Sequence, residues 1–148
     1  MLFRSEDMDG NALKLSSNTD YLQMPDCLSG LTNVTFSGFV KLDELSIWTT
    51  LFSAGVKNGK CITVAAKGNP GGQAVGYTMA INNGAGTEQR VAAADGTVVQ
   101  TGEWVHFVYA QNGSCAQLYL DGVRVESASM LHSRFSGGLS LNHSLGVI

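Results

Sequence analysis

The sequence predicts an all-β fold, in which two antiparallel sheets pack as a sandwich or jelly roll. The clearest signal is the segment from Gly102 to Val125, where β-rich runs are separated by Asn112-Gly113 and Asp121-Gly122. These dipeptides supply the positive φ angles of tight hairpin turns, so the segment is predicted to form a three-stranded meander. Glycine is frequent (18 residues) and only 14% of residues are charged, which favours short strands joined by tight turns.

Short β-rich runs recur along the whole chain, with turn residues between them. The predicted strands are Ala12–Leu15, Tyr21–Met24, Val34–Leu42, Ile47–Ala54, Cys61–Ala66, Val75–Ile81, Glu88–Ala93, Trp104–Ala110, Gln117–Leu120, Val123–Val125 and Gly138–Asn142. No amphipathic helix of useful length is found. Because a single sheet could not bury this many apolar faces, two packed sheets are expected.

The connections between these runs carry ordinary turn chemistry. A turn is expected at Ser16–Asp20, and hairpin links at Gly55–Gly59 and Asn82–Gly86. Lys67–Gln73 contains too much glycine and proline to continue a ladder. The first ten residues are polar and weakly patterned, and are expected to form a weakly ordered extension.

The run from Val34 to Leu42 shows strand alternation. One face is predicted to carry Val34, Phe36, Gly38, Val40 and Leu42, and the other Thr35, Ser37, Phe39 and Lys41. The first face is expected to pack against the core.

The length and the charge of the chain limit the functions that it can have. With 148 residues, of which 44% are apolar, the chain is expected to form one domain over 1–148. A net charge of −3 offers no basic stripe for nucleic acid, and no apolar run approaches the roughly 20 residues that a membrane-spanning helix requires. The N-terminus, MLFRSEDMDG, is too acidic for an export signal. The chain is therefore expected to stay inside the cell or to be a piece of a longer exported protein.

The three cysteines, Cys27, Cys61 and Cys115, form no CxxC pair, which argues against zinc and redox sites. They are expected to be buried free thiols; one pairing plus an odd thiol is the alternative.

Four sequence blocks carry a family resemblance. They are Phe36–Leu42, Trp48 with Leu51–Gly55, Gly102–His106 and Leu118–Gly122. In order and spacing they resemble the laminin G-like, concanavalin A-like jelly-roll modules, and the likeness runs from about Leu13 to the C-terminus. The resemblance implies two face-to-face sheets in an extracellular module, often attached to carbohydrate-active enzymes or adhesion proteins and often holding calcium at the sheet rim.

The end of the chain departs from this family pattern. Such modules usually close with a further strand after a segment like Leu139–Ile148, and here the chain stops at Ile148. An unpaired strand edge invites pairing with another chain. The expectation is either a truncated chain or an edge capped by a second copy.

Catalysis has little support in the sequence. A retaining glycosidase needs two carboxylates about 5 Å apart across a cleft. Asp43 and Glu44 are adjacent, so on a strand they would point to opposite faces. The chain is therefore expected not to be an enzyme.

A shallow ligand site is predicted from polar and aromatic residues of the middle strands, where a ring could stack and amides and a guanidinium could take hydroxyls. Its residues are Trp48, Tyr77, Asn82, Asn83, Gln89 and Arg90. Trp104 and His106 share a face of one strand and could also bind a sugar, but are expected to be buried structural residues. Asp121 is explained by its hairpin turn.

Calcium, if bound, needs several oxygen ligands at the rim of the sheets. The available loop residues are Asn18, Asp20, Asp26 and Asp43. The favoured function is a non-catalytic module that binds carbohydrate or glycoprotein. The alternative is an interaction or self-assembly domain that uses a free sheet edge, without sugar specificity.

Overall fold

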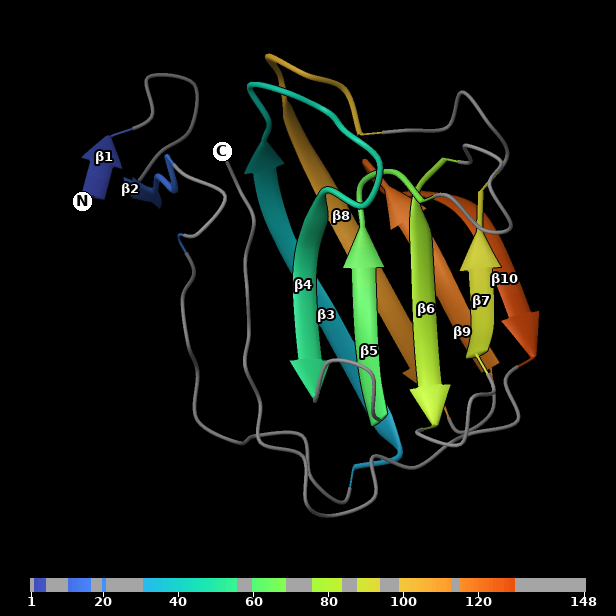
Figure 1. Cartoon of the computed structure of the whole chain (residues 1–148). Helices are drawn as coiled ribbons and strands as arrows, with labels where there is room; N and C mark the ends of the chain where they lie inside the picture. The colour runs from blue at the N-terminus through green and yellow to red at the C-terminus, as the bar shows by residue number, and fades with distance from the viewer. Residues whose placement is uncertain are drawn as a thin grey trace.

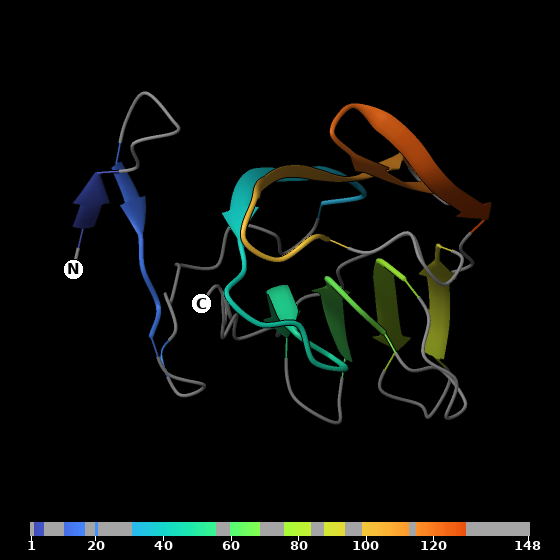
Figure 2. The same cartoon turned by 90° about the horizontal axis from the view of Figure 1, so that it is seen from above.

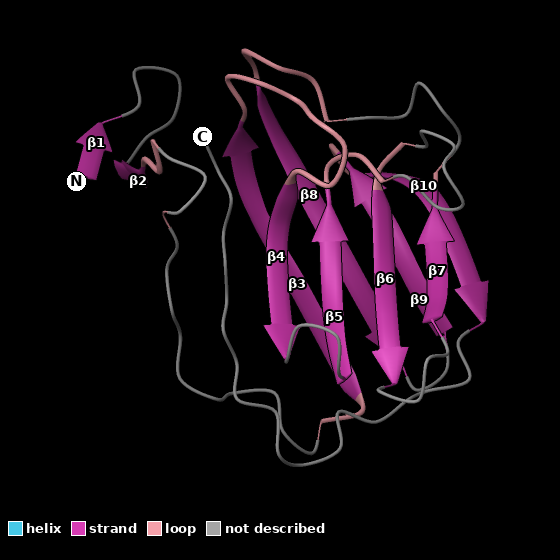
Figure 3. Cartoon of the chain, viewed as in Figure 1, coloured by secondary structure: helices cyan, strands magenta, loops and turns pink. Residues whose placement is uncertain are grey.

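The computed structural model describes residues 2–4, 11–16, 20, 31–55, 60–68, 76–83, 88–93, 99–112 and 115–129. Every regular element in these ranges is a β-strand (Figure 3). The strands are β1 (Leu2–Arg4), β2 (Asn11–Leu13), β3 (Asn33–Lys41), β4 (Thr50–Gly55), β5 (Lys60–Ala65), β6 (Thr78–Asn83), β7 (Glu88–Ala92), β8 (Trp104–Asn112), β9 (Cys115–Leu120) and β10 (Val123–Ser129). In these ranges no helix is long and apolar enough to cross a membrane.

Two antiparallel four-stranded sheets form the body of the molecule. One has the order β10-β9-β8-β3 and the other β4-β5-β6-β7. They lie face to face in both views (Figures 1 and 2), while the β1–β2 hairpin lies to one side of them. The predicted all-β, two-sheet sandwich is therefore confirmed.

Several strand boundaries differ from those expected. β4 begins at Thr50 rather than Ile47, because Trp48 has a left-handed backbone (φ 64°) that cannot continue a strand. β6 begins at Thr78 after two bent residues. β1 lies in the polar N-terminus, where no strand was predicted, and it pairs with β2, which overlaps the predicted strand Ala12–Leu15. The predicted strands Tyr21–Met24 and Gly138–Asn142 lie outside the described residues.

The meander of β8, β9 and β10 forms as predicted. Asp121 (φ 49°) and Gly122 (φ 78°) make the two-residue turn between β9 and β10. The Asp121 carboxylate accepts a hydrogen bond from the backbone N–H of His106 (2.9 Å), and the Asp121 N–H donates to the His106 carbonyl (2.8 Å). Asp121 is thus a turn residue, as predicted, and the structure shows that it also ties the hairpin to β8.

Strand alternation decides which residues enter the core. In β3, Val34 and Val40 are buried, whereas Thr35, Ser37 and Phe39 are exposed. β3 pairs with β8 along its whole length, and Phe36 lies opposite Tyr109. In β8 the inward side chains are Val105, Phe107, Tyr109 and Gln111. The predicted inward face of β3 is therefore confirmed.

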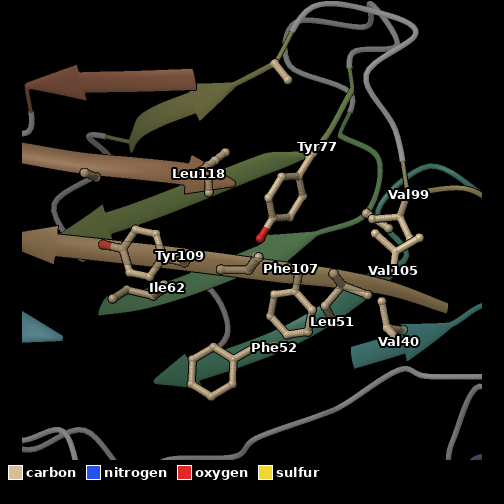
Figure 4. Packing of buried hydrophobic residues seen from close by; sticks show 14 of the residues in the cluster. Val40, Leu51, Phe52, Ile62, Tyr77, Val99, Val105, Phe107, Tyr109 and Leu118 are labelled. Carbon is tan, nitrogen blue, oxygen red and sulfur yellow. The ribbon is translucent and has the colours of Figure 1, made fainter. Parts of the chain in front are cut away.

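Aromatic rings join the two sheets in the core. Phe36 of β3 stacks on Phe52 of β4 with ring centroids 4.1 Å apart, and on Tyr109 of β8 at 5.8 Å. Figure 4 shows Phe52, Tyr77 and Tyr109 among the buried apolar side chains between the sheets. Burial of these large rings supplies much of the driving force that holds the sheets together.

The cysteines are placed differently from one another. Cys115 is a free thiol and is exposed at the start of β9, so the prediction of a buried thiol is wrong for this residue. It fails because Cys115 alternates with the buried Ala116 at a hairpin end. Cys61 lies in β5, opposite Asn82, and Cys27 lies outside the described residues.

Two core tyrosines differ in their hydrogen bonding. The Tyr109 hydroxyl donates to the side-chain oxygen of Gln111, which is also buried. The Tyr77 hydroxyl is buried and has no hydrogen-bond partner in the described part of the chain. A buried hydroxyl without a partner costs free energy that a paired hydroxyl does not.

Replacing each tyrosine by phenylalanine is expected to affect stability differently at the two positions. Tyr77→Phe should leave the free energy of unfolding unchanged or raise it by up to about 1 kcal/mol, because it removes an unpaired polar group. Tyr109→Phe should lower it by about 1–2 kcal/mol, because Gln111 loses a donor. Urea unfolding of both variants at neutral pH measures the difference, and a loss of stability in Tyr77→Phe equal to that in Tyr109→Phe would contradict it.

Candidate functional site

Trp48 is held in a tight turn at the start of β4. Its backbone N–H donates to the Lys67 carbonyl beyond β5 (2.8 Å). Hydrogen bonds between Ser46 and Thr49 close the turn: the Ser46 N–H donates to Thr49 Oγ1 (3.0 Å), and Thr49 Oγ1 donates to the Ser46 carbonyl (2.9 Å). A left-handed backbone in a bulky residue costs about 1–2 kcal/mol and persists only where the surroundings enforce it.

Arg90 of β7 meets the Trp48 ring. The guanidinium carbon lies 5.4 Å from the ring centroid, within range of a cation–π contact. β4 and β7 are the two edges of their sheet, so about 14 Å separates their backbones. The two side chains therefore reach across β5 and β6 to meet.

The Trp48–Arg90 pair lies on the outer face of this sheet. Arg90 is level with Ala80 and Thr63 in the ladder, and Thr63 alternates with the core residues Ile62 and Val64. Arg90 is exposed and Trp48 is half-buried. The pair thus presents an indole ring and a guanidinium together on a sheet face that points away from the core.

Tyr77 does not belong to this surface. It was predicted to offer its ring to a ligand, but it is fully buried in the core, and this expectation is corrected. Burial also raises the pKa of its hydroxyl well above the ordinary value. Its neighbour Thr78 lies on the outward-facing side of β6 but is also fully buried. The Thr78 hydroxyl donates to the Gly76 carbonyl (2.8 Å).

The three remaining predicted ligand residues lie in strands β6 and β7. Asn82 pairs with Glu88, and Gln89 pairs with Ile81. Asn83 ends β6 opposite Lys60. Asn82 and Asn83 were expected in the turn between β6 and β7 but belong to the strand. Of the six predicted ligand residues, only Trp48 and Arg90 are joined by a side-chain contact in the described part of the chain.

The predicted calcium ligands are not seen to cluster in the described part of the chain. The Asp20 carboxylate accepts a hydrogen bond from the Ser16 N–H (2.9 Å), and Asp43 is exposed after β3. Asn18 and Asp26 lie outside the described residues. Over the ranges that the structure describes, no three His, Cys, Asp or Glu side chains gather where they could hold a metal, and the calcium site stays a prediction.

Trp104 and His106 lie on the outer face of the other sheet. They were expected to be buried structural residues, but both are only half-buried and alternate with the inward Val105 and Phe107. That expectation is wrong because immediate neighbours on a strand point to the opposite face. The exposed Phe39 ring lies 4.7 Å from the His106 ring, between centroids. The alternation of apolar residues in β8 is the signal that could have revealed these positions.

The strain at Trp48 can be tested by two substitutions that both remove the ring. Trp48→Gly is expected to be more stable than Trp48→Ala by about 1 kcal/mol, because glycine adopts a φ of 64° without the penalty that alanine retains. Chemical denaturation of the two variants under identical conditions measures this difference. Equal stabilities would show that the turn does not hold residue 48 in a left-handed conformation.

Comparison with known proteins gives matches at the level of family and fold. The family described as the concanavalin A-like lectin/glucanases superfamily matches residues 16–146. No curated protein matches the chain.

Among solved structures, the chain is similar to domain 4 of AbnA, a GH43 extracellular arabinanase from Geobacillus stearothermophilus, in complex with arabinotriose. The TM-score is 0.66 at 21% identity, over 86% of this chain and 60% of that chain. It is also similar to the heptameric SAP-like pentraxin of Limulus polyphemus, with a TM-score of 0.49 at 13% identity, over 86% of this chain and 58% of that chain. The match over most of the chain, together with the two-sheet sandwich, shows that the chain belongs to the concanavalin A-like lectin/glucanase superfamily.

Proposed function

We propose that this chain is a non-catalytic module that binds carbohydrate or glycoprotein, and that it works outside the cell. The observation that carries the proposal is the contact between the Trp48 ring and the Arg90 guanidinium on the outer face of the β4–β7 sheet. The family also supports it, and so does the similar AbnA domain, which belongs to an extracellular enzyme and was solved with arabinotriose.

The chemistry of this pair suits a sugar. An indole presents a flat apolar surface against which the C–H groups of a sugar ring can pack. A guanidinium that stacks on a ring keeps N–H donors in its plane, and these can bind hydroxyl oxygens. Because the turn of Ser46 and Thr49 fixes the Trp48 backbone, less conformational entropy is lost when a ligand binds.

The arrangement of described carboxylates favours binding over catalysis. Asp43 and Glu44 are exposed in the segment after β3, and Glu103 is exposed just before β8. The Asp121 carboxylate already accepts the His106 N–H. A glycosidase needs one acid and one nucleophile or base that face each other across a bound sugar, whereas the contact described between Trp48 and Arg90 contains no carboxylate.

A glycan array, followed by calorimetric titration of each hit, tests the proposal. Arabinotriose is included as a probe, and each titration is run with calcium and with a chelator. Trp48→Ala should weaken binding about tenfold or more, the loss expected for an aromatic anchor. Ile47→Ala is the matched control, because Ile47 is 46% exposed in the same turn, and its binding should be unchanged. Absence of binding by the unaltered protein to every glycan would overturn the proposal.

A second candidate function is self-assembly along β3. Among the described strands β3 pairs only with β8, so its other edge has no described partner strand. Light scattering at increasing protein concentration tests this: a concentration-dependent dimer supports pairing with a second copy, and a monomer throughout contradicts it.

A further inference from the structure

The outer face of the β10-β9-β8-β3 sheet carries four aromatic or imidazole side chains. They are Phe39 of β3, Trp104 and His106 of β8, and Tyr119 of β9. Each alternates with buried core residues and so points away from the core. Phe39 is 56% exposed, and the other three are half-buried. Figure 2 shows no other described strand over this side of the sheet.

The register places these rings in three successive rows. Trp104 is opposite Lys41, and Phe39 is opposite His106. In the third row Ser37 is opposite Val108, which is opposite Tyr119. Side chains two residues apart on one face of a strand are about 7 Å apart. The rings therefore form a track of three rows that crosses from β8 and β3 to β9.

Hydrogen bonds hold this track in place. The backbone N–H and carbonyl of His106 are both bonded to Asp121, at 2.9 and 2.8 Å. The Phe39 and His106 rings pack at 4.7 Å with an interplanar angle of 33°. The Tyr119 hydroxyl donates to Gln117 Oε1 (2.7 Å), which orients the phenol ring. Rigid rings bind a ligand with a smaller loss of side-chain freedom than mobile ones.

The surroundings of the rings distinguish a sugar chain from a protein partner. A protein interface needs about 800 Å² on each side, with an apolar centre. Here Phe39 and Val123 are the only exposed large hydrophobic side chains among the described residues of this sheet, and the register places polar Ser37, Lys41 and Gln117 beside the rings on the same face. Rings flanked by hydrogen-bonding groups match the C–H faces and hydroxyls along an oligosaccharide.

We propose that this aromatic track is a second carbohydrate site, which takes a linear oligosaccharide of at least three sugar rings. The proposal rests on the proposed carbohydrate binding but assigns it to the sheet opposite the Trp48–Arg90 pair. One sugar ring packs on Phe39 beside His106, and its neighbours pack on Trp104 and Tyr119. Binding at two faces would let one module hold two chains, or two parts of one polysaccharide.

Titrations with xylohexaose, cellohexaose and arabinohexaose, and with the corresponding trisaccharides and monosaccharides, test the track. At least one hexaose should bind, the monosaccharides should not, and Phe39→Ala and Tyr119→Ala should each raise its Kd about tenfold. Phe39→Tyr keeps the ring and should retain binding. Val123→Ala is the control, because Val123 is 65% exposed on the same sheet but lies off the track.

The outcomes separate this inference from the proposed function. Hexaose binding that survives Phe39→Ala and Tyr119→Ala but is lost in Trp48→Ala overturns the track and leaves the first site intact. Failure of the unaltered protein to bind any of the three hexaoses also overturns the track, whereas the proposed function is decided by the wider glycan array. Loss of hexaose binding in both track variants, with array binding at the first site retained, supports the track alone.

Discussion

Gly68→Ala is expected to lower the free energy of unfolding by about 3 kcal/mol. A methyl group at this position would lie 2.4 Å from Thr78 Oγ1 and 2.8 Å from Thr78 Cβ. Thr78 cannot move away easily, because it is fully buried and its hydroxyl donates to the Gly76 carbonyl (2.8 Å). The Gly68 N–H donates to the same carbonyl (3.2 Å), so a shift would disturb both bonds. Urea unfolding of the variant measures the loss.

Gly122→Ala is the matched control, because it separates lack of space from backbone conformation. Gly122 has a φ of +78°, but a methyl group there would meet nothing within 4 Å. Its replacement should cost only the left-handed penalty of about 1 kcal/mol. A double-mutant cycle with Thr78→Gly should recover part of the loss at Gly68, since the clash is with Thr78 itself. Equal losses in Gly68→Ala and Gly122→Ala, or no coupling to residue 78, would refute this account.

Strand alternation and turn chemistry made most of the fold predictable. The apolar alternation of β3 predicted its inward face correctly, and Asp121-Gly122 predicted the hairpin between β9 and β10. Both signals are local, because side-chain direction in a strand has a period of two and positive φ angles select particular residues. They remain informative without knowledge of the tertiary structure.

The candidate site was harder to predict, because it depends on contacts between distant segments. Trp48 has none of the residue preferences of a left-handed turn, and its conformation is enforced by its own bond to Lys67 and by the bonds between Ser46 and Thr49 on either side of it. Its partner Arg90 comes from the opposite edge of the sheet. The sequence could predict only the types of residue in the site, a ring and a guanidinium, and not their contact.

Two errors in the prediction came from neglecting strand alternation. Tyr77 shares its parity with the apolar Met79 and Ile81 of the same segment, which is the pattern of an inward residue, and it is buried. Trp104 and His106 were judged by their apolar neighbours, but Val105 and Phe107 point inward and therefore direct them outward. In both cases the period of two was a better guide than residue type.

Raising the pH is expected to destabilise the fold steeply above about pH 10, through its two buried tyrosines. Burial raises the pKa of both Tyr77 and Tyr109 well above their ordinary value of about 10. Above that pH the unfolded chain releases phenolic protons that the folded chain retains, so the unfolded state binds fewer protons and stability falls as pH rises. Their contribution is complete below about pH 10 and is lost as the pH rises through the raised pKa values. Two such groups give a slope of about 2.7 kcal/mol per pH unit.

The double variant Tyr77→Phe/Tyr109→Phe isolates this effect from the deprotonation of other groups. Unfolding by urea between about pH 9 and about pH 12 should show a much shallower loss of stability in the double variant than in the unaltered protein. Tyr119→Phe is the control, because it removes a tyrosine hydroxyl from the outer face and leaves the core intact. Its pH profile should follow that of the unaltered protein. If all three proteins lose stability with the same slope, the buried tyrosines do not govern the alkaline limit of this fold, and burial of their hydroxyls between the sheets would have to be reconsidered.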